Sequence, residues 1–508
     1  MNDKLVSDKP VDDEVVNWTI MVYMSADDVL ANFAIDSLNQ FRSAATAVGD
    51  KVEALFDPND GTGKAYRYSF EFKEKDVSLS VAGEKVEEKK IEDAPLSSFG
   101  GETPGHQNNM ADPKILAEFV NSVTEPPDKS RKYCLILWGH GTELLLDQDP
   151  GFKGERYLTP AKLQRALEGT GFNENNKLDI IAFDACSMSM IELASALKGR
   201  VRFMIASQDE VPDVSFPYQR ILERLRGHGK NPKNVSTLIP EIYVQSFRDY
   251  FVTPRNGVQE IMLSSLDLDH IEEITTPINA LASLLLQSVD DEDLCRAIVS
   301  ARQASMDFVL GLFVDLRDFC EKLATSVPML VETMTDTPQE RHAKRDRYSN
   351  IARECEKTVE AIDNKKCVIA NATRKGKKAG HGVSIYFPYS VQRDESAQTK
   401  RLLGEGETGI VNLELVKGGS IITRKARDAR MEELEDDFAR LPFFKKQDGW
   451  GAFIFQGWSV VLARSGESVD LHYSARRWAQ NLSTEVGKIN ARLTNLIEEN
   501  KKKKGKAG

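Results

Sequence analysis

The sequence predicts an α/β protein, an α/β/α sandwich with a mostly parallel central sheet, followed by a helix-rich C-terminal part. Two observations support this fold class. Between residues 18 and 206, short apolar runs alternate with segments of helical spacing, which is typical of a parallel sheet covered on both faces. From residue 263 onward, long amphipathic segments take over. These segments are 270–288, 291–306, 315–331 and 340–363.

Apolar runs predict where the buried strands lie, and the segments between them predict helices. The expected strands are 18–25, 52–56, 133–138, 178–183, 201–206 and, much later in the chain, 383–387. The expected helices of the first half are 29–41, 113–123, 158–167 and 188–197. Residues 66–92 alternate polar and apolar positions, which indicates a hairpin at a sheet edge, and Gly418-Gly419 indicates a second hairpin.

The chain has 508 residues, which exceeds what one hydrophobic core usually supports, so we expect two or three domains. Changes in pattern along the sequence predict their boundaries. We expect a flexible lead-in at 1–17, the α/β domain at 18–268, a helical region with a returning strand at 269–390, and an extension with a hairpin and helices at 391–508. The lysine run 501–504 is interpreted as a solvated tail.

Composition excludes several classes of partner. The formal net charge is −11, which disfavours nucleic acid and favours attraction of cationic substrates. No apolar run approaches the roughly 20 residues that a membrane-spanning helix needs. Because the N-terminus lacks a signal pattern, we expect a cytoplasmic protein, or a secreted one if a leader was removed. Six cysteines without a CxxC pair argue against a disulfide framework and a structural zinc site.

A histidine and a cysteine follow two of the predicted buried strands. His140 lies between two glycines directly after the strand at 133–138, and Cys186 follows the strand at 178–183. The 46 residues between them allow one strand–helix–strand crossover, so both strand ends can open onto the same cleft. A buried cysteine such as Cys134 is usually inert, but a cysteine and a histidine at matching strand ends indicate a hydrolase.

The chemistry of a thiol nucleophile explains these residue types. A thiol attacks as the thiolate, whose formation is favoured by a nearby imidazole or a helix N-terminus. We expect His140 to supply the first, and Cys186, at the start of the helix predicted to begin near residue 188, to have the second. The glycines beside His140 leave the backbone exposed. The N–H groups of Gly141 and Cys186 can therefore point at a developing oxyanion.

Both motifs resemble the catalytic motifs of the clostripain family of cysteine peptidases, which shares a caspase-like fold with legumain, gingipain and separase. The two segments are Leu-Ile-Leu-Trp-Gly-His-Gly at 135–141 and Phe-Asp-Ala-Cys-Ser-Met at 183–188. Further segments resemble the family at 18–27, 56–60, 109–113, 313–319 and 382–388, so the resemblance covers roughly residues 18–390.

The resemblance implies a cysteine endopeptidase in which Cys186 is the nucleophile and His140 donates a proton to the leaving amine. It also implies an oxyanion hole made of Gly141 and Cys186, and a preference for a basic residue, usually arginine with lysine as the alternative, before the scissile bond. A basic side chain requires an acidic partner in its pocket. Asp184 matches the family's acid at that position, with the alternative that it braces the nucleophile turn. The loop at 206–210 supplies the second candidate, Asp209, together with Ser207 and Glu210.

Other features of relatives are carried over as further expectations. Relatives often mature by cutting themselves between the two motifs, where this chain has Lys153 and Arg156 in a glycine-containing loop. Some relatives respond to calcium, and Glu143, Asp147 and Asp149 form an acidic cluster near His140, although a solvated acidic loop is the simpler interpretation. The chemistry itself requires no cofactor. The loop 211–218 departs from the family pattern, which leaves the wall of the specificity pocket open.

Three hypotheses about function follow. The leading one is an endopeptidase whose substrates are proteins or peptides with basic residues, acting through an acyl-enzyme intermediate. The second is a scaffold or adaptor protein with the same fold and a vestigial dyad. The third is a protease held silent until a partner or self-cleavage opens its cleft. The oligomeric state and the role of residues 391–508 stay open at this level.

Overall fold

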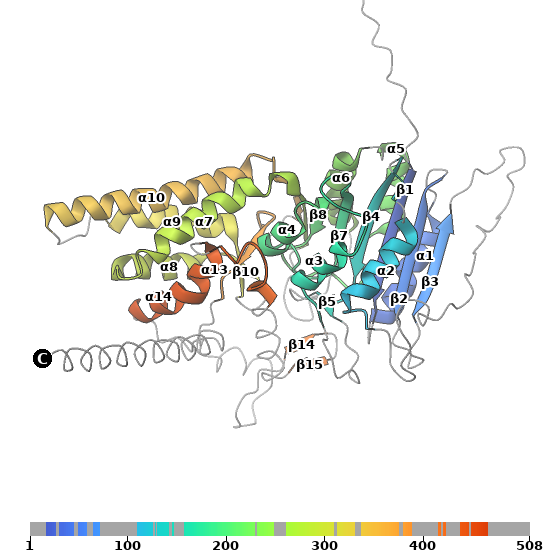
Figure 1. The fold of residues 1–508 in the computed structure, drawn as a ribbon, viewed down its shortest axis with the longest axis horizontal. Coiled ribbons are helices and arrows are strands. Elements are labelled where there is room, and N and C mark those ends of the chain that lie inside the picture. The colour runs from blue at the N-terminus through green and yellow to red at the C-terminus, as the bar shows by residue number, and fades with distance from the viewer. Residues whose placement is uncertain are drawn as a thin grey trace, which may run out of the picture.

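The computed structural model, shown in Figure 1, contains an eight-stranded sheet in the half of the molecule that lies beside the long helices. The strand order is β12-β9-β8-β7-β4-β1-β2-β3. The five strands from β8 to β2 in this order run parallel to one another. At the two edges, β9 is antiparallel to β8, β12 is antiparallel to β9, and β3 is antiparallel to β2. The strands are β1 (Asn17–Ser25), β2 (Lys51–Asp57), β3 (Tyr66–Glu71), β4 (Arg131–Trp138), β7 (Leu178–Asp184), β8 (Val201–Ala206), β9 (Met262–Asp267) and β12 (Val368–Thr373).

The structure describes only part of the chain. The described residues are 17–26, 30–44, 49–57, 65–71, 109–124, 127–128, 130–141, 145–146, 157–228, 231–247, 261–308, 312–330, 337–374, 379–388, 415–417, 420–422, 437–446 and 449–465. Within these ranges, we find no helix whose length and apolarity would suffice to span a lipid bilayer.

Helices cover both faces of the sheet. Alternate residues of β1 illustrate the two layers, since Ile20 and Val22 join one hydrophobic core while Met21 and Tyr23 join the other. The predicted α/β/α sandwich with a mostly parallel sheet is therefore confirmed. One face carries α1 (Ala31–Ser43), α5 (Tyr218–His228) and α6 (Pro232–Ser246), and the other carries α2 (Pro113–Thr124), α3 (Pro160–Glu168) and α4 (Ile191–Leu197).

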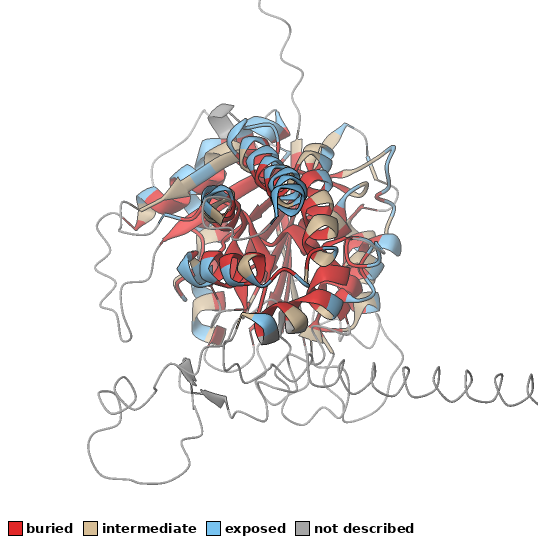
Figure 2. Cartoon of the chain, turned by 90° about the vertical axis from the view of Figure 1, so that its left-hand side faces the viewer, coloured by how far each residue is buried: buried red, intermediate tan, exposed pale blue. Residues whose placement is uncertain are grey.

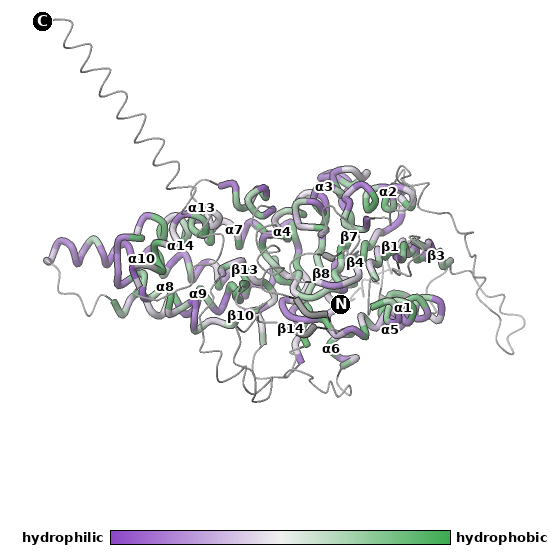
Figure 3. The backbone as a smooth tube through the Cα atoms, turned by 90° about the horizontal axis from the view of Figure 1, so that it is seen from below, coloured by the Kyte–Doolittle hydropathy of each residue, from purple (hydrophilic) through white to green (hydrophobic). Residues whose placement is uncertain are grey.

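A helical lobe lies beside the sheet along the longest axis of the molecule (Figure 1). One hydrophobic core runs from the sheet into this lobe without interruption. Figure 3 shows the hydrophilic outer end of α10 projecting away from it. The lobe consists of α7 (Glu272–Leu286), α8 (Glu292–Ala304), α9 (Leu316–Met329), α10 (Pro338–Asp363) and a small sheet of β10 (Asp307–Phe308), β11 (Phe313–Asp315) and β13 (Ser384–Tyr386).

Part of the C-terminal extension completes this lobe. The Nε1 atom of Trp450 donates to Tyr386 O at 2.9 Å, and Nε1 of Trp458 donates to Pro388 O at 2.8 Å. Both indole rings are buried, and Figure 2 shows how buried residues fill the lobe under an exposed outer surface. This segment contains α13 (Trp450–Ala452), a π-helical turn (Phe453–Gly457) and α14 (Trp458–Arg464).

Several predicted elements need correction. The helix expected from residue 188 begins only at Ile191. The strand expected at 383–387 does form, as β13, but it belongs to the small sheet, and the strand that returns to the main sheet is β12. At the other edge, β3 pairs with β2, and the remainder of the hairpin predicted at 66–92 lies outside the described residues. The second predicted hairpin is confirmed by β14 (Leu415–Lys417) and β15 (Ser420–Ile422).

Candidate active site

The histidine and cysteine motifs lie at the ends of adjacent parallel strands. In the register between β4 and β7, Trp138 is the partner of Asp184. Just beyond this pair, Gly139 N donates to Asp184 O at 3.2 Å. His140 and Cys186 each lie two residues after these paired positions, beyond the carboxyl ends of the strands, where functional groups of parallel sheets usually gather. The structure therefore brings the two predicted catalytic residues to the same sheet edge.

Glycines press the histidine turn against the nucleophile turn. A Cβ atom at Gly141 would lie 2.2 Å from Cys186 O and 2.4 Å from Cys186 N, so no other residue fits there. Gly139 has a φ of +154°, and a Cβ atom on it would lie 2.8 Å from Ser25 O. Both glycines flanking His140 are thus required by close backbone contacts. The backbone of Gly141 lies directly beside that of Cys186, as an oxyanion hole made of these two residues requires.

Cys186 is not at the start of a helix, which corrects the prediction made from the sequence. After Cys186 the chain passes through Ser187, with a φ of +60°, and continues in irregular conformation to Ile191. Backbone pairing with distant segments holds this path, since Ser189 N donates to Ser207 O at 2.8 Å. A helix N-terminus therefore does not act on the thiol. A backbone donor replaces it, because Val211 N donates to the sulfur of Cys186 at 3.3 Å.

Cys186 also differs from the other five cysteines in exposure. It is partly exposed, and the other five are buried. Burial raises the pKa of Cys134 and Cys367 to about 12 and that of Cys295 to about 11. A buried thiol with a raised pKa carries almost no thiolate near neutral pH and reacts slowly. Accessibility alone thus singles out Cys186 as the reactive cysteine.

Asp184 is a buried acid that ties the end of β7 to the loop 211–218. Asp184 is only 4% exposed. Its Oδ2 atom accepts hydrogen bonds from Phe216 N at 3.0 Å, from Tyr218 OH at 2.5 Å and from the Ser215 hydroxyl. Trp138 Nε1 donates to Ser215 Oγ at 2.6 Å, which directs the hydroxyl hydrogen of Ser215 toward Asp184. Burial raises the pKa of Asp184 to about 6, against the opposing effect of these hydrogen bonds.

The second acidic candidate is more accessible. Asp209 and Glu210 are half-buried, in the loop that carries Val211 against the thiol. Ser207, by contrast, is fully buried, and its Oγ accepts from Asp209 N at 3.1 Å. Asp209 O in turn accepts from Ser187 N at 3.0 Å. Ser207 therefore shapes this loop from within, whereas Asp209 lies near the nucleophile with part of its surface open to solvent.

The remaining residues that the sequence singled out cannot be placed. Lys153 and Arg156, the candidates for self-cleavage, lie outside the described residues, as do Glu143, Asp147 and Asp149 of the acidic cluster. Over the part of the chain that the structure describes, no group of three or more His, Cys, Asp or Glu side chains is arranged to hold a metal ion.

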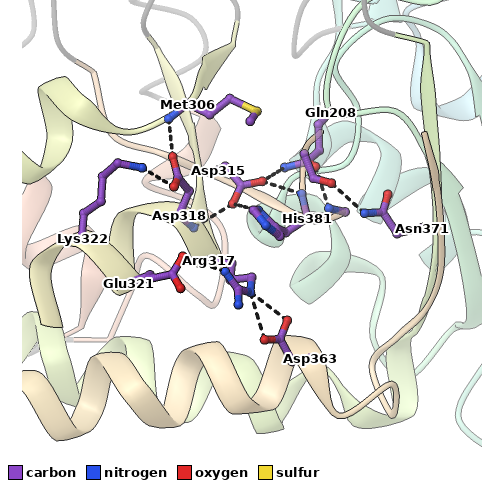
Figure 4. Close-up of polar contacts among 12 residues, drawn as sticks. Gln208, Met306, Asp315, Arg317, Asp318, Glu321, Lys322, Asp363, Asn371 and His381 are labelled. Atoms are coloured by element: carbon purple, nitrogen blue, oxygen red, sulfur yellow. Dashed lines mark hydrogen bonds and ion pairs between the residues drawn. The ribbon is translucent and has the colours of Figure 1, made fainter. Parts of the chain in front are cut away.

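Sequence reasoning missed a cluster of polar side chains behind the loop 207–211, which is drawn in Figure 4. Gln208 from the loop contacts Asp315, and Asp315 contacts His381. A signal was available, because Asp315 and Gly382 lie in the two later segments that resemble the clostripain family. The first segment contains charged residues, but no sequence pattern connected them to the nucleophile more than 120 residues earlier.

Comparison with known proteins identifies a family and several similar proteins. The model of the clostripain family, peptidase C11, matches residues 22–458. Clostripain from Hathewaya histolytica is 23% identical over 361 residues, which are 61% of this chain and 66% of that protein. One similar solved structure is that of a secreted C11 cysteine protease from Bacteroides thetaiotaomicron in complex with an irreversible peptide inhibitor. It is 16% identical in sequence and has a TM-score of 0.46, and the match covers 77% of this chain and 97% of that one. An inactive zymogen C11 protease from Parabacteroides distasonis is 17% identical, with a TM-score of 0.47 over 75% and 95%.

Proposed function

The chain belongs to the clostripain family of cysteine peptidases, and we propose that it is an endopeptidase that cleaves after arginine or lysine through a Cys186–His140 dyad. The observation that carries the proposal is the contact between Gly141 and the backbone of Cys186. This contact holds the turn that contains His140 against the turn that contains Cys186. Cys186 is the one partly exposed cysteine of the chain.

The proposed reaction proceeds in two steps. The Cys186 thiolate attacks the carbonyl carbon before the scissile bond, and the oxyanion accepts hydrogen bonds from the N–H groups of Gly141 and Cys186. The C–N bond then breaks, and His140 gives a proton to the leaving amine. In the second step, His140 takes a proton from water as the water oxygen attacks the thioester carbonyl. The C–S bond then breaks, the carboxylic acid product leaves, and the Cys186 thiolate re-forms beside the protonated His140.

A substitution of the nucleophile tests the proposal. We expect Cys186→Ala to abolish cleavage of arginyl and lysyl reporter peptides, whereas Cys134→Ala, which changes a buried cysteine on the next strand, should retain cleavage in its folded fraction. An arginyl acyloxymethyl ketone should label Cys186 alone, as read by peptide mass mapping. Turnover that persists in Cys186→Ala would refute the dyad, and a folded but inactive wild type, with and without added calcium or EDTA, would favour the scaffold hypothesis.

Specificity for a basic side chain is assigned to Asp209 as its first binding partner. Its carboxylate belongs to a half-buried residue near the nucleophile, whereas Asp184 already accepts three hydrogen bonds in a buried position. We predict that Asp209→Asn lowers kcat/KM for arginyl reporters at least tenfold more than for a leucyl reporter. Asp184→Asn should lower both to a similar extent. The reverse ranking of the two variants would place the specificity acid at Asp184.

A further inference from the structure

The loop that follows β8 lies directly against the nucleophile. Val211 N donates to the sulfur of Cys186 at 3.3 Å, and the sulfur contacts Val211 O at 3.7 Å. The first contact gains strength when the sulfur is a thiolate, because the acceptor is then charged, whereas the second requires the thiol proton. A hydrogen bond to the charged form lowers a pKa. The position of Val211 therefore influences how readily Cys186 ionises.

The buried side chain of Gln208 anchors this loop to the helical lobe. Gln208 is 2% exposed, its Nε2 donates to Asp315 Oδ2 at 3.1 Å, and its Oε1 accepts from Gly382 N at 2.6 Å (Figure 4). Because a donor and an acceptor are both engaged, the amide has one orientation and the backbone at Gln208 has one position. The anchor is three residues before Val211, and the intervening Asp209 O is bonded to Ser187 N at 3.0 Å.

Asp315 is the hub to which Gln208 is bound. It is fully buried, and its two oxygens also accept from Asp318 N at 2.8 Å, His381 N at 2.7 Å and His381 Nδ1 at 2.9 Å. Burial opposes the charge, but the hydrogen bonds and the charge of His381 outweigh it and keep the pKa of Asp315 below its usual value. Asp315 therefore stays an acceptor-only carboxylate across the pH range in which a cysteine protease works.

His381 closes the cluster toward solvent. Its side chain is 34% exposed, and the hydrogen bond that His381 donates to Asp315 raises the pKa of His381, against burial and the nearby positive charge of Arg317, with Asp318 adding a smaller raising effect. Gly380 and Gly382 on either side of it are packed tightly, since a Cβ atom at Gly380 would lie 2.4 Å from Gln208 Oε1. The segment 379–384 thus fits against the amide of Gln208 at close range.

We propose that Gln208, Asp315 and His381 are positioning residues that hold Val211 N–H against the Cys186 sulfur, so that the helical lobe tunes the reactivity of the nucleophile. This inference rests on the proposed role of Cys186. None of the three residues touches the sulfur itself in the contacts above, so they act through the loop backbone. The cluster joins three segments, the loop after β8, the start of α9 and the turn before β13, that meet only in the folded chain.

The test measures the thiol itself. The rate of alkylation of Cys186 by iodoacetamide, followed by peptide mass mapping from pH 5 to pH 9.5, gives the apparent pKa of the thiol without any substrate. We expect Gln208→Met, which keeps the length and removes both hydrogen bonds, to raise that pKa by about one unit or more and to lower kcat at least tenfold with KM changed less than twofold. His381→Ala should act in the same direction, and His381→Asn, whose amide can replace the Nδ1 donor, should restore most of the reactivity.

A matched control lies in the same region. Asp363→Asn removes the carboxylate charge that pairs with Arg317 on α9, at 2.8 Å, without touching Gln208 or Asp315, and should leave the alkylation profile unchanged. The inference would be overturned if the alkylation profiles of wild type, Gln208→Met and His381→Ala were identical and activity fell only in proportion to the folded fraction. Normal alkylation of Cys186 without peptide cleavage in the wild type would instead contradict the proposed function and still leave the positioning role measurable.

Discussion

Asp184 shows how a single buried carboxylate can organise the wall of the site. Three neutral donors from the loop 211–218 converge on its Oδ2 atom, and one of them, Ser215, is itself oriented by Trp138. The loop is therefore fastened to the end of the strand that carries the nucleophile. These three donors are neutral, so dipoles rather than a paired cation stabilise the charge of Asp184, which is costly in a buried position.

This cost predicts a pH dependence of stability. The pKa of Asp184 in the folded protein is raised to about 6, above its value in the unfolded chain, so the residue favours folding only while it is protonated. Relative to Asp184→Asn, the wild type should lose about 2 kcal/mol as the pH rises from 4 to 7. Urea unfolding of both proteins at four pH values in this range measures the difference. A difference that does not change with pH would mean that the carboxyl stays ionised throughout.

At the scale of elements, the sequence predicted the strands whose positions follow from a local run of apolar residues. The strands β1, β4, β7 and β8 are continuous apolar runs, and their ends carry His140 and Cys186, so the pairing of these two residues followed from topology alone. The path after Cys186 did not, because residues 187–190 are held by Ser207 and Ser384, partners that local periodicity cannot reveal.

The same reasoning explains why the C-terminal extension was not understood from sequence. Residues 437–465 contain aromatic side chains without a clear period, and their partners lie in β13 and α9. Asp437 reaches even farther, because its Oδ2 accepts from Ala161 N at 2.9 Å at the start of α3. An extension that supplies both a core tryptophan and a helix cap is part of the fold rather than an appendage.

Trp450 provides the test at this scale. Its fully buried ring packs edge-on against Phe387 and Phe319, and its Nε1 donates to Tyr386 O. Trp450→Ala should reduce the free energy of unfolding by about 3–5 kcal/mol through the cavity it leaves. Trp450→Phe should cost less, about 1–3 kcal/mol, because the ring is retained while a buried carbonyl loses its donor. Urea unfolding monitored by circular dichroism gives both values, and equal losses would show that packing of the ring contributes little.

At the scale of the whole molecule, the helical lobe and the sheet share more than an interface. β12, which follows α10 in the chain, forms the last strand of the main sheet and pairs with β9 from Met262 to Leu266. Asp267 N also donates to Cys367 O at 2.7 Å. The hydrophobic core continues from β7 and β8 through α7 into the lobe. The boundary predicted at 268 therefore separates two patterns in the sequence while the physical core runs across it.

This continuity predicts that residues 1–268 do not fold alone. Without β12, β9 loses its partners on one edge, and without α7 and the residue before it the side chains of Ile271, Ile274 and Ile278 no longer cover the core. We expect the isolated fragment to lack near-ultraviolet circular dichroism and a cooperative urea transition, and the full chain to unfold in one transition by both near- and far-ultraviolet signals. Co-expression with residues 269–508 is the matched control and should restore the ordered signal. A fragment that unfolds cooperatively at a urea midpoint near that of the full chain would establish two independent domains. The coupling inferred between Gln208 and the helical lobe would then act across an ordinary interface between domains.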